Sequence, residues 1–150
     1  MAYVEHERIR AAVNWGDPVH LFFQPEWQRK TLQKSEYLYD WFEAQAAIYG
    51  ADNVEDFLQA ASKLSLQTSG ILDRPSCPVL TVNGKNDTLI PISNHFLLSE
   101  KGSPKTMWIN PQGRHMGHDQ VIQNDDIHGT VVIPWLRARL FPSTPQGRWV

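Results

Sequence analysis

Hydrophobic residues gather into three short runs, at residues 9–15, 78–83 and 106–110, and each run predicts a buried β-strand. The first run stops at Gly16-Asp17-Pro18, a cluster of residues typical of turns. Short apolar strands without alternation are typical of a parallel sheet whose two faces are both covered. Residues 92–101 predict a helix between the second and third strands, as a parallel crossover requires. The pattern therefore predicts an α/β fold with a mostly parallel sheet.

Residues 21–70 have a different pattern, in which aromatic and aliphatic residues recur at roughly helical spacing. Ser35 can cap one helix, and Asp52 or Asn53 can cap the next. Two aromatic-rich helices between strands fit a cap or lid better than a linker. We therefore predict that 21–70 is a helical cap insertion that stands off the sheet.

The remaining segments are assigned around this insertion. Residues 1–20 and 71–141 are predicted to form the core of the fold, and 142–150 a tail. Residues 3–10 resemble the last turns of a helix, and 130–140 predict a final amphipathic helix.

Composition narrows the class of protein. Of the 150 residues, 41% are hydrophobic and 20% are charged, which is ordinary for a globular chain. The net charge of −2 gives no basic footprint for nucleic acid, so we expect no nucleic-acid partner. No apolar run approaches the roughly 18 residues that span a membrane, and no membrane association is expected. Cys77 is the single cysteine, which favours a reducing, cytoplasmic location.

Two ionisable residues follow the second and third predicted strands, namely Asp87 and His115. Parallel α/β sheets collect catalytic groups at the carboxyl ends of their strands, so we expect these side chains on one sheet edge, within about 2.6–3.2 Å of each other. A carboxylate that accepts the Nδ1–H of an imidazole leaves Nε2 free as a general base. Alone, Asp87 could simply cap its turn and His115 could be structural. Together they predict a catalytic pair.

The stretch 78–117 resembles the final third of an α/β-hydrolase, with Asn-Gly-Lys-Asn-Asp at 83–87 and Gly-Arg-His-Met-Gly at 113–117. The segment Ala-Val-Asn-Trp-Gly-Asp-Pro-Val-His at 12–20 is similar to the FrsA-like esterase group. That group includes fungal polyketide-shortening hydrolases and a carbon–carbon hydrolase of nicotine breakdown. The resemblance implies a Ser-His-Asp triad with Asp87 as the acid, His115 as the base and no cofactor. The implied substrate is a small acyl or polyketide-like molecule, cleaved at an ester or β-dicarbonyl carbon–carbon bond.

The sequence departs from this family at the nucleophile, because none of its serines has a glycine two residues to each side. Residues 1–8 resemble the helix that follows the nucleophile in relatives. We therefore expect only the C-terminal portion of the fold, inactive on its own, with a homodimer or a complementing N-terminal half as possible partners. A strand 9–15 without its neighbour would leave an apolar edge open to association. A non-catalytic ligand-binding or regulatory protein, or an inactive gene fragment, is the alternative.

Further residues are candidates for contact with a substrate. His20 lies where the family group tends to have a histidine, although a structural role at the strand end is equally compatible. An aromatic pocket could use Trp41, Phe42 and Tyr49, for which core packing is the competing interpretation; Met116, beside His115, completes the set.

Three histidines of the C-terminal half are candidates for a metal site or a surface position. His115, His118 and Asp119 have a spacing that could suggest a metal site, but no further cluster completes it, and no metal is expected. His95 falls on the predicted helix 92–101, and we expect it on the surface.

Overall fold

The computed structural model describes residues 1–32, 40–101 and 105–141. Its sheet has three parallel strands, β1 (Ala12–Trp15), β2 (Val79–Gly84) and β3 (Lys105–Asn110), in the order β1-β2-β3. All three strands were predicted within a few residues of these bounds. The parallel α/β arrangement predicted from the sequence is therefore confirmed for the described residues.

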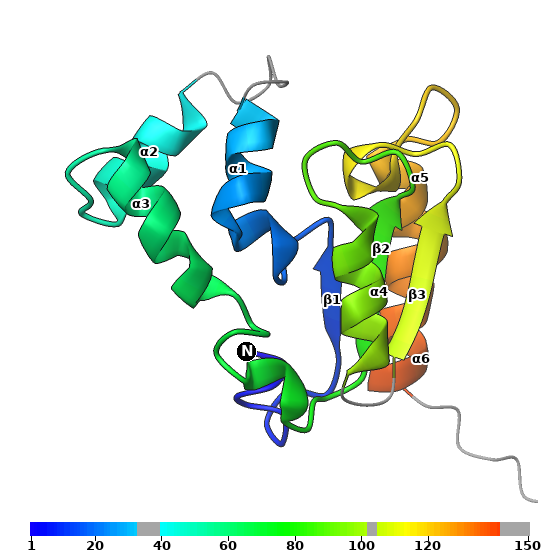
Figure 1. Cartoon of the computed structure of the whole chain (residues 1–150). Coiled ribbons are helices and arrows are strands. Elements are labelled where there is room, and N and C mark those ends of the chain that lie inside the picture. Colours follow the sequence, from blue (N-terminus) through cyan, green and yellow to red (C-terminus); the bar gives the residue numbers. More distant parts are fainter. Residues whose placement is uncertain (33–39, 102–104, 142–150) are drawn as a thin grey trace, which may run out of the picture.

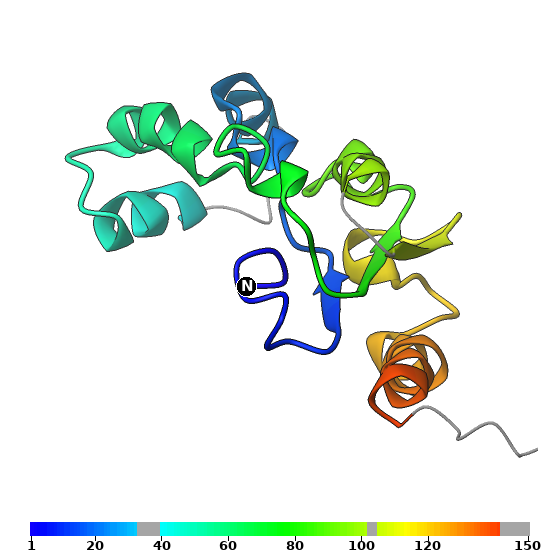
Figure 2. The ribbon, with the colours of Figure 1, turned by 90° about the horizontal axis from the view of Figure 1, so that it is seen from below.

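Helices cover both faces of this sheet (Figures 1 and 2). On one face lies α4 (Ile92–Glu100), which links β2 to β3 as predicted. On the other lies the helix that runs through α5 (Asn124–Ile127) and α6 (Ile133–Leu140). Successive residues of a strand face opposite sides, so Leu80 and Val82 pack toward α5 and α6, while Val79 packs with the α4 side. Both faces of β2 are therefore buried.

The final helix starts earlier than the predicted residue 130. The helix α5 begins at a capping box formed by Gln123 and Asp126. The side chain of each residue accepts a hydrogen bond from the backbone N–H of the other. A π-helical segment, His128–Val132, joins α5 to α6 and places Pro134 in the first turn of α6. Proline has no N–H to donate, and because the helix is continuous through this point, Pro134 lies in its interior, directly after the π-helical segment in which the backbone hydrogen-bond pattern departs from that of an α-helix.

The described part of residues 21–70 contains helices and no strand, as predicted. It holds a 3-10 turn (Leu21–Phe23) and the helices α1 (Pro25–Leu32), α2 (Trp41–Ile48) and α3 (Val54–Ala61). Asn53 caps α3 as expected, accepting a hydrogen bond from the backbone N–H of Asp56 at 3.0 Å. The expected cap residue Ser35 lies outside the described residues.

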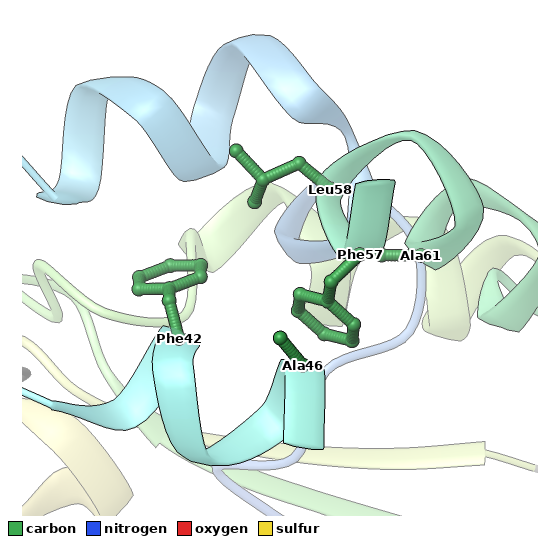
Figure 3. Close-up of a cluster of buried hydrophobic side chains, with 5 residues drawn as sticks. All are labelled: Phe42, Ala46, Phe57, Leu58 and Ala61. Carbon is green, nitrogen blue, oxygen red and sulfur yellow. The ribbon is translucent and has the colours of Figure 1, made fainter. Parts of the chain in front are cut away.

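These helices have a hydrophobic core of their own (Figure 3). Its buried members come from α2 and α3: Phe42, Ala46, Phe57, Leu58 and Ala61. Leu89, from the loop that follows β2, packs against the same cluster. The helical segment is thereby fixed to the loop that carries Asp87.

Two predictions for the ends of the chain have different outcomes. Residues 3–10 were predicted to be helical, and this is wrong, because they form two separate turns. One turn is closed by the bond from Glu5 N to Met1 O and the other by the bond from Ile9 N to Glu5 O. Isolated turns of this length do not repay the entropy cost of a helix nucleus. The predicted tail, 142–150, lies outside the described residues. Among the described residues, no helix is long and apolar enough to cross a membrane.

The loops that follow β2 and β3 pass very close to each other at Gly84. A Cβ on Gly84 would overlap the backbone carbonyl groups of Gly113 and Arg114. The two loops are also joined by backbone hydrogen bonds, from Lys85 N to Asn110 O and from Asn86 N to Gly113 O, both 2.9 Å. Glycine at position 84 therefore allows the two loops to lie side by side.

We predict that Gly84→Ala lowers the free energy of unfolding by at least about 3 kcal/mol, because the added methyl meets backbone that cannot rotate away. The matched control is Gly129→Ala, in the final helix, where a Cβ has no neighbour within 4 Å. The control should be neutral or stabilise by up to about 1 kcal/mol. Denaturant unfolding measures both variants, and equal stability of the two would contradict this account of the loop approach.

Candidate active site

Asp87 lies in the loop after β2, and its carboxylate is held by the backbone that follows it. Oδ1 accepts hydrogen bonds from the N–H groups of Leu89 at 2.8 Å and Ile90 at 3.0 Å. In such a turn the aspartate side chain accepts hydrogen bonds from the backbone that follows it, so the carboxylate is oriented without help from another side chain. Its second oxygen, Oδ2, is left to face the interior of the site.

His115 follows β3 and reaches this second oxygen. Its Nδ1 lies 3.0 Å from Oδ2 of Asp87, so the hydrogen bond predicted from the sequence is present. The Asp87 side chain is fully buried, whereas that of His115 is 36% exposed. With Nδ1–H donated to the carboxylate, Nε2 carries the lone pair, and no described residue forms a hydrogen bond with it. The pair therefore presents one basic nitrogen at the surface.

The backbone around His115 is fixed from two strands. Trp15, at the end of β1, donates its Nε1–H to the carbonyl of Met116 at 2.6 Å. Asn110, at the end of β3, donates to the carbonyl of Gly117 at 2.9 Å. Met116 has φ of 61°, a left-handed conformation that costs a non-glycine residue about 1 kcal/mol or more. These contacts hold the strained turn and, with it, the direction of the imidazole.

The electrostatics of Asp87 are set by two opposing effects. Burial raises the pKa of its carboxyl group, and hydrogen bonds from His115, Asn83, Ile90 and Leu89 lower it. The hydrogen bonds prevail, so the pKa of Asp87 lies below its ordinary value. The carboxylate is therefore ionised at neutral pH and can stabilise a positive charge on His115.

His95 was expected on the surface, and this is wrong, because its side chain is fully buried. It projects from α4 between Thr81 and Asn83, which share the α4 face of β2 by strand alternation. Its Nδ1 contacts Thr81 Oγ1, and its Nε2 lies 2.8 Å from the amide nitrogen of Asn83. Burial lowers the pKa of His95 to about 4, although Asp87 nearby acts in the opposite direction. The imidazole is therefore neutral at pH 7.

A small cavity of about 170 Å³ opens beside the pair. Its lining comes from the loop after β1, from the helical segment and from the two site loops: Gly16, Asp17, Pro18, Phe22, Trp41, Leu89, Ile90 and His115. Ligand pockets usually have at least about 300 Å³, so this cavity could hold a small acyl group rather than a whole substrate.

The other pocket candidates lie in different places. Nδ1 of His20 lies 2.7 Å from Ser65 Oγ, within hydrogen-bonding distance, and His20 lines a separate open hollow on the α1 side. Phe42 is fully buried in the core of the helical segment, and Tyr49 is 56% exposed at the end of α2. Of the three aromatic candidates, the structure therefore brings only Trp41 to the cavity beside His115.

Asp119 has a structural setting in the loop after His115. Its Oδ1 accepts from the N–H groups of Val121 and Ile122, each at 2.7 Å, and its Oδ2 accepts from Asn110 at 2.7 Å. In the described parts of the chain, no group of three or more histidine, cysteine, aspartate or glutamate side chains is placed to hold a metal ion. Asp119 is thus occupied in fixing the His115 loop.

Comparison with known proteins adds the fold class. No protein-family model and no curated protein sequence matches this chain. The chain is similar to the crystal structure of 2,6-dihydroxy-pseudo-oxynicotine hydrolase, with a TM-score of 0.61 and 20% sequence identity over 87% of this chain. The likeness shows that the two chains share a fold over this part. The chain spans 34% of the length of that hydrolase, about one third.

The burial of neutral His95 predicts a pH dependence of stability. Its folded pKa of about 4 lies below the ordinary 6.5, so the unfolded chain takes up the proton first as pH falls. The stabilisation is complete above about pH 6.5 and is lost toward pH 4, with a loss of about 3 kcal/mol in the free energy of unfolding. In His95→Gln this part of the pH dependence should disappear. Denaturant unfolding between pH 4 and 7 measures it, and identical slopes for both proteins would contradict the prediction.

Proposed function

We propose that this chain supplies the acid and the base of a serine-type hydrolase site, with Asp87 orienting His115. The observation that carries the proposal is the 3.0 Å hydrogen bond from His115 to Asp87, formed between loops at the carboxyl ends of neighbouring parallel strands. The hydrolase-like fold and the small cavity beside the imidazole support it. The order of acid and then histidine along the chain is also that of α/β-hydrolases.

In the proposed reaction, a serine oxygen attacks the substrate carbonyl carbon while Nε2 of His115 takes its proton. The bond from the carbonyl carbon to the leaving group then breaks, and the imidazolium returns the proton to the leaving oxygen or carbon. Water next attacks the acyl-serine with Nε2 as its base, which releases an acid and restores the serine. The ionised Asp87 stabilises the imidazolium in both halves of the cycle.

The nucleophile is proposed to lie on polypeptide outside these 150 residues, within a larger hydrolase of the FrsA-like group. Two observations favour this. The sequence has no serine flanked by glycines two residues away on each side, and no serine of the described chain lines the cavity beside His115. The free edge of β1 is the place where further strands of such a sheet could pair.

The helical segment 21–70 is proposed to act as a cap that contacts the acyl part of the substrate. Phe22 and Trp41 line the cavity from this segment, and Trp27 donates its Nε1–H to the carbonyl of Leu89 at 3.3 Å. Apolar groups on one wall and His115 on the other fit a small acyl chain, joined through an ester or a β-dicarbonyl carbon–carbon bond. A cytoplasmic location remains a prediction from the single cysteine.

We predict that the 150-residue chain alone does not turn over short activated esters, whereas a polypeptide extended to include a nucleophile segment does. In the extended protein, His115→Ala should lower kcat by about 10⁴-fold or more, because no other group accepts the serine proton. Asp87→Asn should lower kcat by about 10⁴-fold, because the wrong tautomer of His115 is then favoured.

The control for this assay is His118→Ala, which removes a histidine from the same loop without touching the pair and should keep its activity. Retention of activity in His115→Ala would refute the assignment of the base. Turnover by the 150-residue chain, abolished by His115→Ala, would place the nucleophile within this sequence. Binding of acyl compounds without turnover in the extended protein would instead favour a ligand-binding protein.

A further inference from the structure

Behind the Asp87–His115 pair, a buried chain of hydrogen bonds continues through Asn83 to His95 and Thr81. The amide nitrogen of Asn83 lies 2.8 Å from Asp87 Oδ2 and 2.8 Å from His95 Nε2. Asn83 and His95 are both fully buried, so neither exchanges these partners for water. Asp87 Oδ2 therefore has two donors, His115 from the solvent side and Asn83 from the interior.

The direction of each bond in this chain follows from the ionised carboxylate. An atom that faces a carboxylate oxygen at 2.8 Å must be a donor, so the Asn83 amide is oriented with its NH₂ group toward Asp87. The second hydrogen of the same NH₂ group then points at His95 Nε2, which must accept it and cannot carry a proton. The remaining ring nitrogen, Nδ1, holds the proton and donates it to Thr81 Oγ1. The Thr81 hydroxyl group donates a hydrogen bond in turn to Asn14 Oδ1, at 3.5 Å.

We propose that Asn83 and His95 are positioning residues for the Asp87–His115 pair, in which neutral His95 accepts one Asn83 amide hydrogen and so holds the other on Asp87. This inference rests on the proposed function only for the catalytic value of the pair. In a positively charged His95, Nε2 would carry a proton and face the Asn83 nitrogen, which is also a donor. The Asn83 amide could accept that proton only by turning over, and its oxygen would then face the Asp87 carboxylate. The titratable groups that face His95 are Asp87 and His115.

Two features of the packing support a specific role for this arrangement. Two polar residues, Thr81 and Asn83, are fully buried on the α4 face of β2, and Asn83 Oδ1 is buried without a hydrogen-bond partner in the described structure. A buried polar atom without a partner costs about 1–3 kcal/mol, so fold stability alone does not favour asparagine here. The NH₂ group of Asn83, by contrast, lies 2.8 Å from both Asp87 Oδ2 and His95 Nε2 and only 3.5 Å from the Ile90 carbonyl, so its two hydrogens serve the two short contacts.

The test is NMR on the full 150-residue chain labelled with ¹⁵N, because ring-nitrogen shifts report which nitrogen of each histidine carries the proton. At pH 7, wild-type His95 should be in the Nδ1–H form. The variant His95→Phe keeps a ring of similar volume but removes the nitrogen that accepts the Asn83 amide hydrogen. The Asn83 amide protons should then exchange with solvent about tenfold faster, the effect of losing one hydrogen bond of about 1.4 kcal/mol. The pKa of Asp87 should also rise, because its carboxylate loses the support of a fixed donor.

His95→Gln is the conservative variant, because a glutamine oxygen can take the place of Nε2 as acceptor, and it should restore both readouts to wild-type values. A folded His95→Phe with both readouts unchanged would overturn the proposal. Equal effects of His95→Phe and His95→Gln would overturn it as well, since packing rather than the acceptor would then be responsible. Should His95→Phe fail to fold, the wild-type spectrum decides: an Nε2–H or charged His95 at pH 7 contradicts the proposal. None of these readouts needs turnover, so failure of the proposed hydrolysis is recognised separately.

Discussion

A buried carboxylate charge is the constraint on which the site depends. An ionised group taken out of water costs several kcal/mol unless its oxygens are satisfied, and the Asp87 side chain is fully buried. Each of its oxygens accepts two hydrogen bonds, one pair from the backbone of the same loop and the other from Asn83 and His115. The hydrogen bonds outweigh burial, so the charge persists inside the protein and can act on the imidazole.

The rest of the fold serves the placement of these donors. Parallel pairing of β2 and β3 brings the two loops to one sheet edge, and Gly84 lets their backbones lie in contact. Strand alternation puts Asn83 on the face covered by α4, the helix that carries His95. The neighbouring α4 residue, Asn94, accepts from the N–H groups of residues 20 and 21 and so fixes the start of the helical segment. The helix α4 therefore contacts both Asn83, which donates to Asp87, and the start of the helical segment.

The sequence was sufficient to predict the elements with strong local signals. The three strands, the linking helix and the Asp87–His115 contact follow from apolar runs and from the position of polar residues at strand ends. His95 was missed because α4 reverses the usual pattern, burying Asn94 and His95 and leaving Phe96 46% exposed. Hydrophobic periodicity assigns such polar residues to solvent. Thr81 and Asn83, polar at alternate positions of a buried strand, were the available signal of a polar partner beneath that face.

The helical segment shows a second limit of sequence reasoning. Its periodicity predicted helices, but it could not decide which aromatic residue meets the site. Trp41 begins α2 and reaches the cavity, while the adjacent Phe42 points into the core of the segment (Figure 3). Adjacent residues on a helix differ by about 100° in direction, so this choice depends on how the helix docks on the loop after β2.

The central claim is that hydrogen bonds keep buried Asp87 ionised and in contact with His115. A titration of the Asp87 side-chain carboxyl carbon, followed by ¹³C NMR, measures this most directly. We predict a pKa of Asp87 below the ordinary value of about 3.9 for aspartate, despite burial, and a higher pKa of Asp87 in Asn83→Ala. A pKa of Asp87 above the ordinary value would show that burial prevails over its hydrogen bonds, and this result would contradict the account.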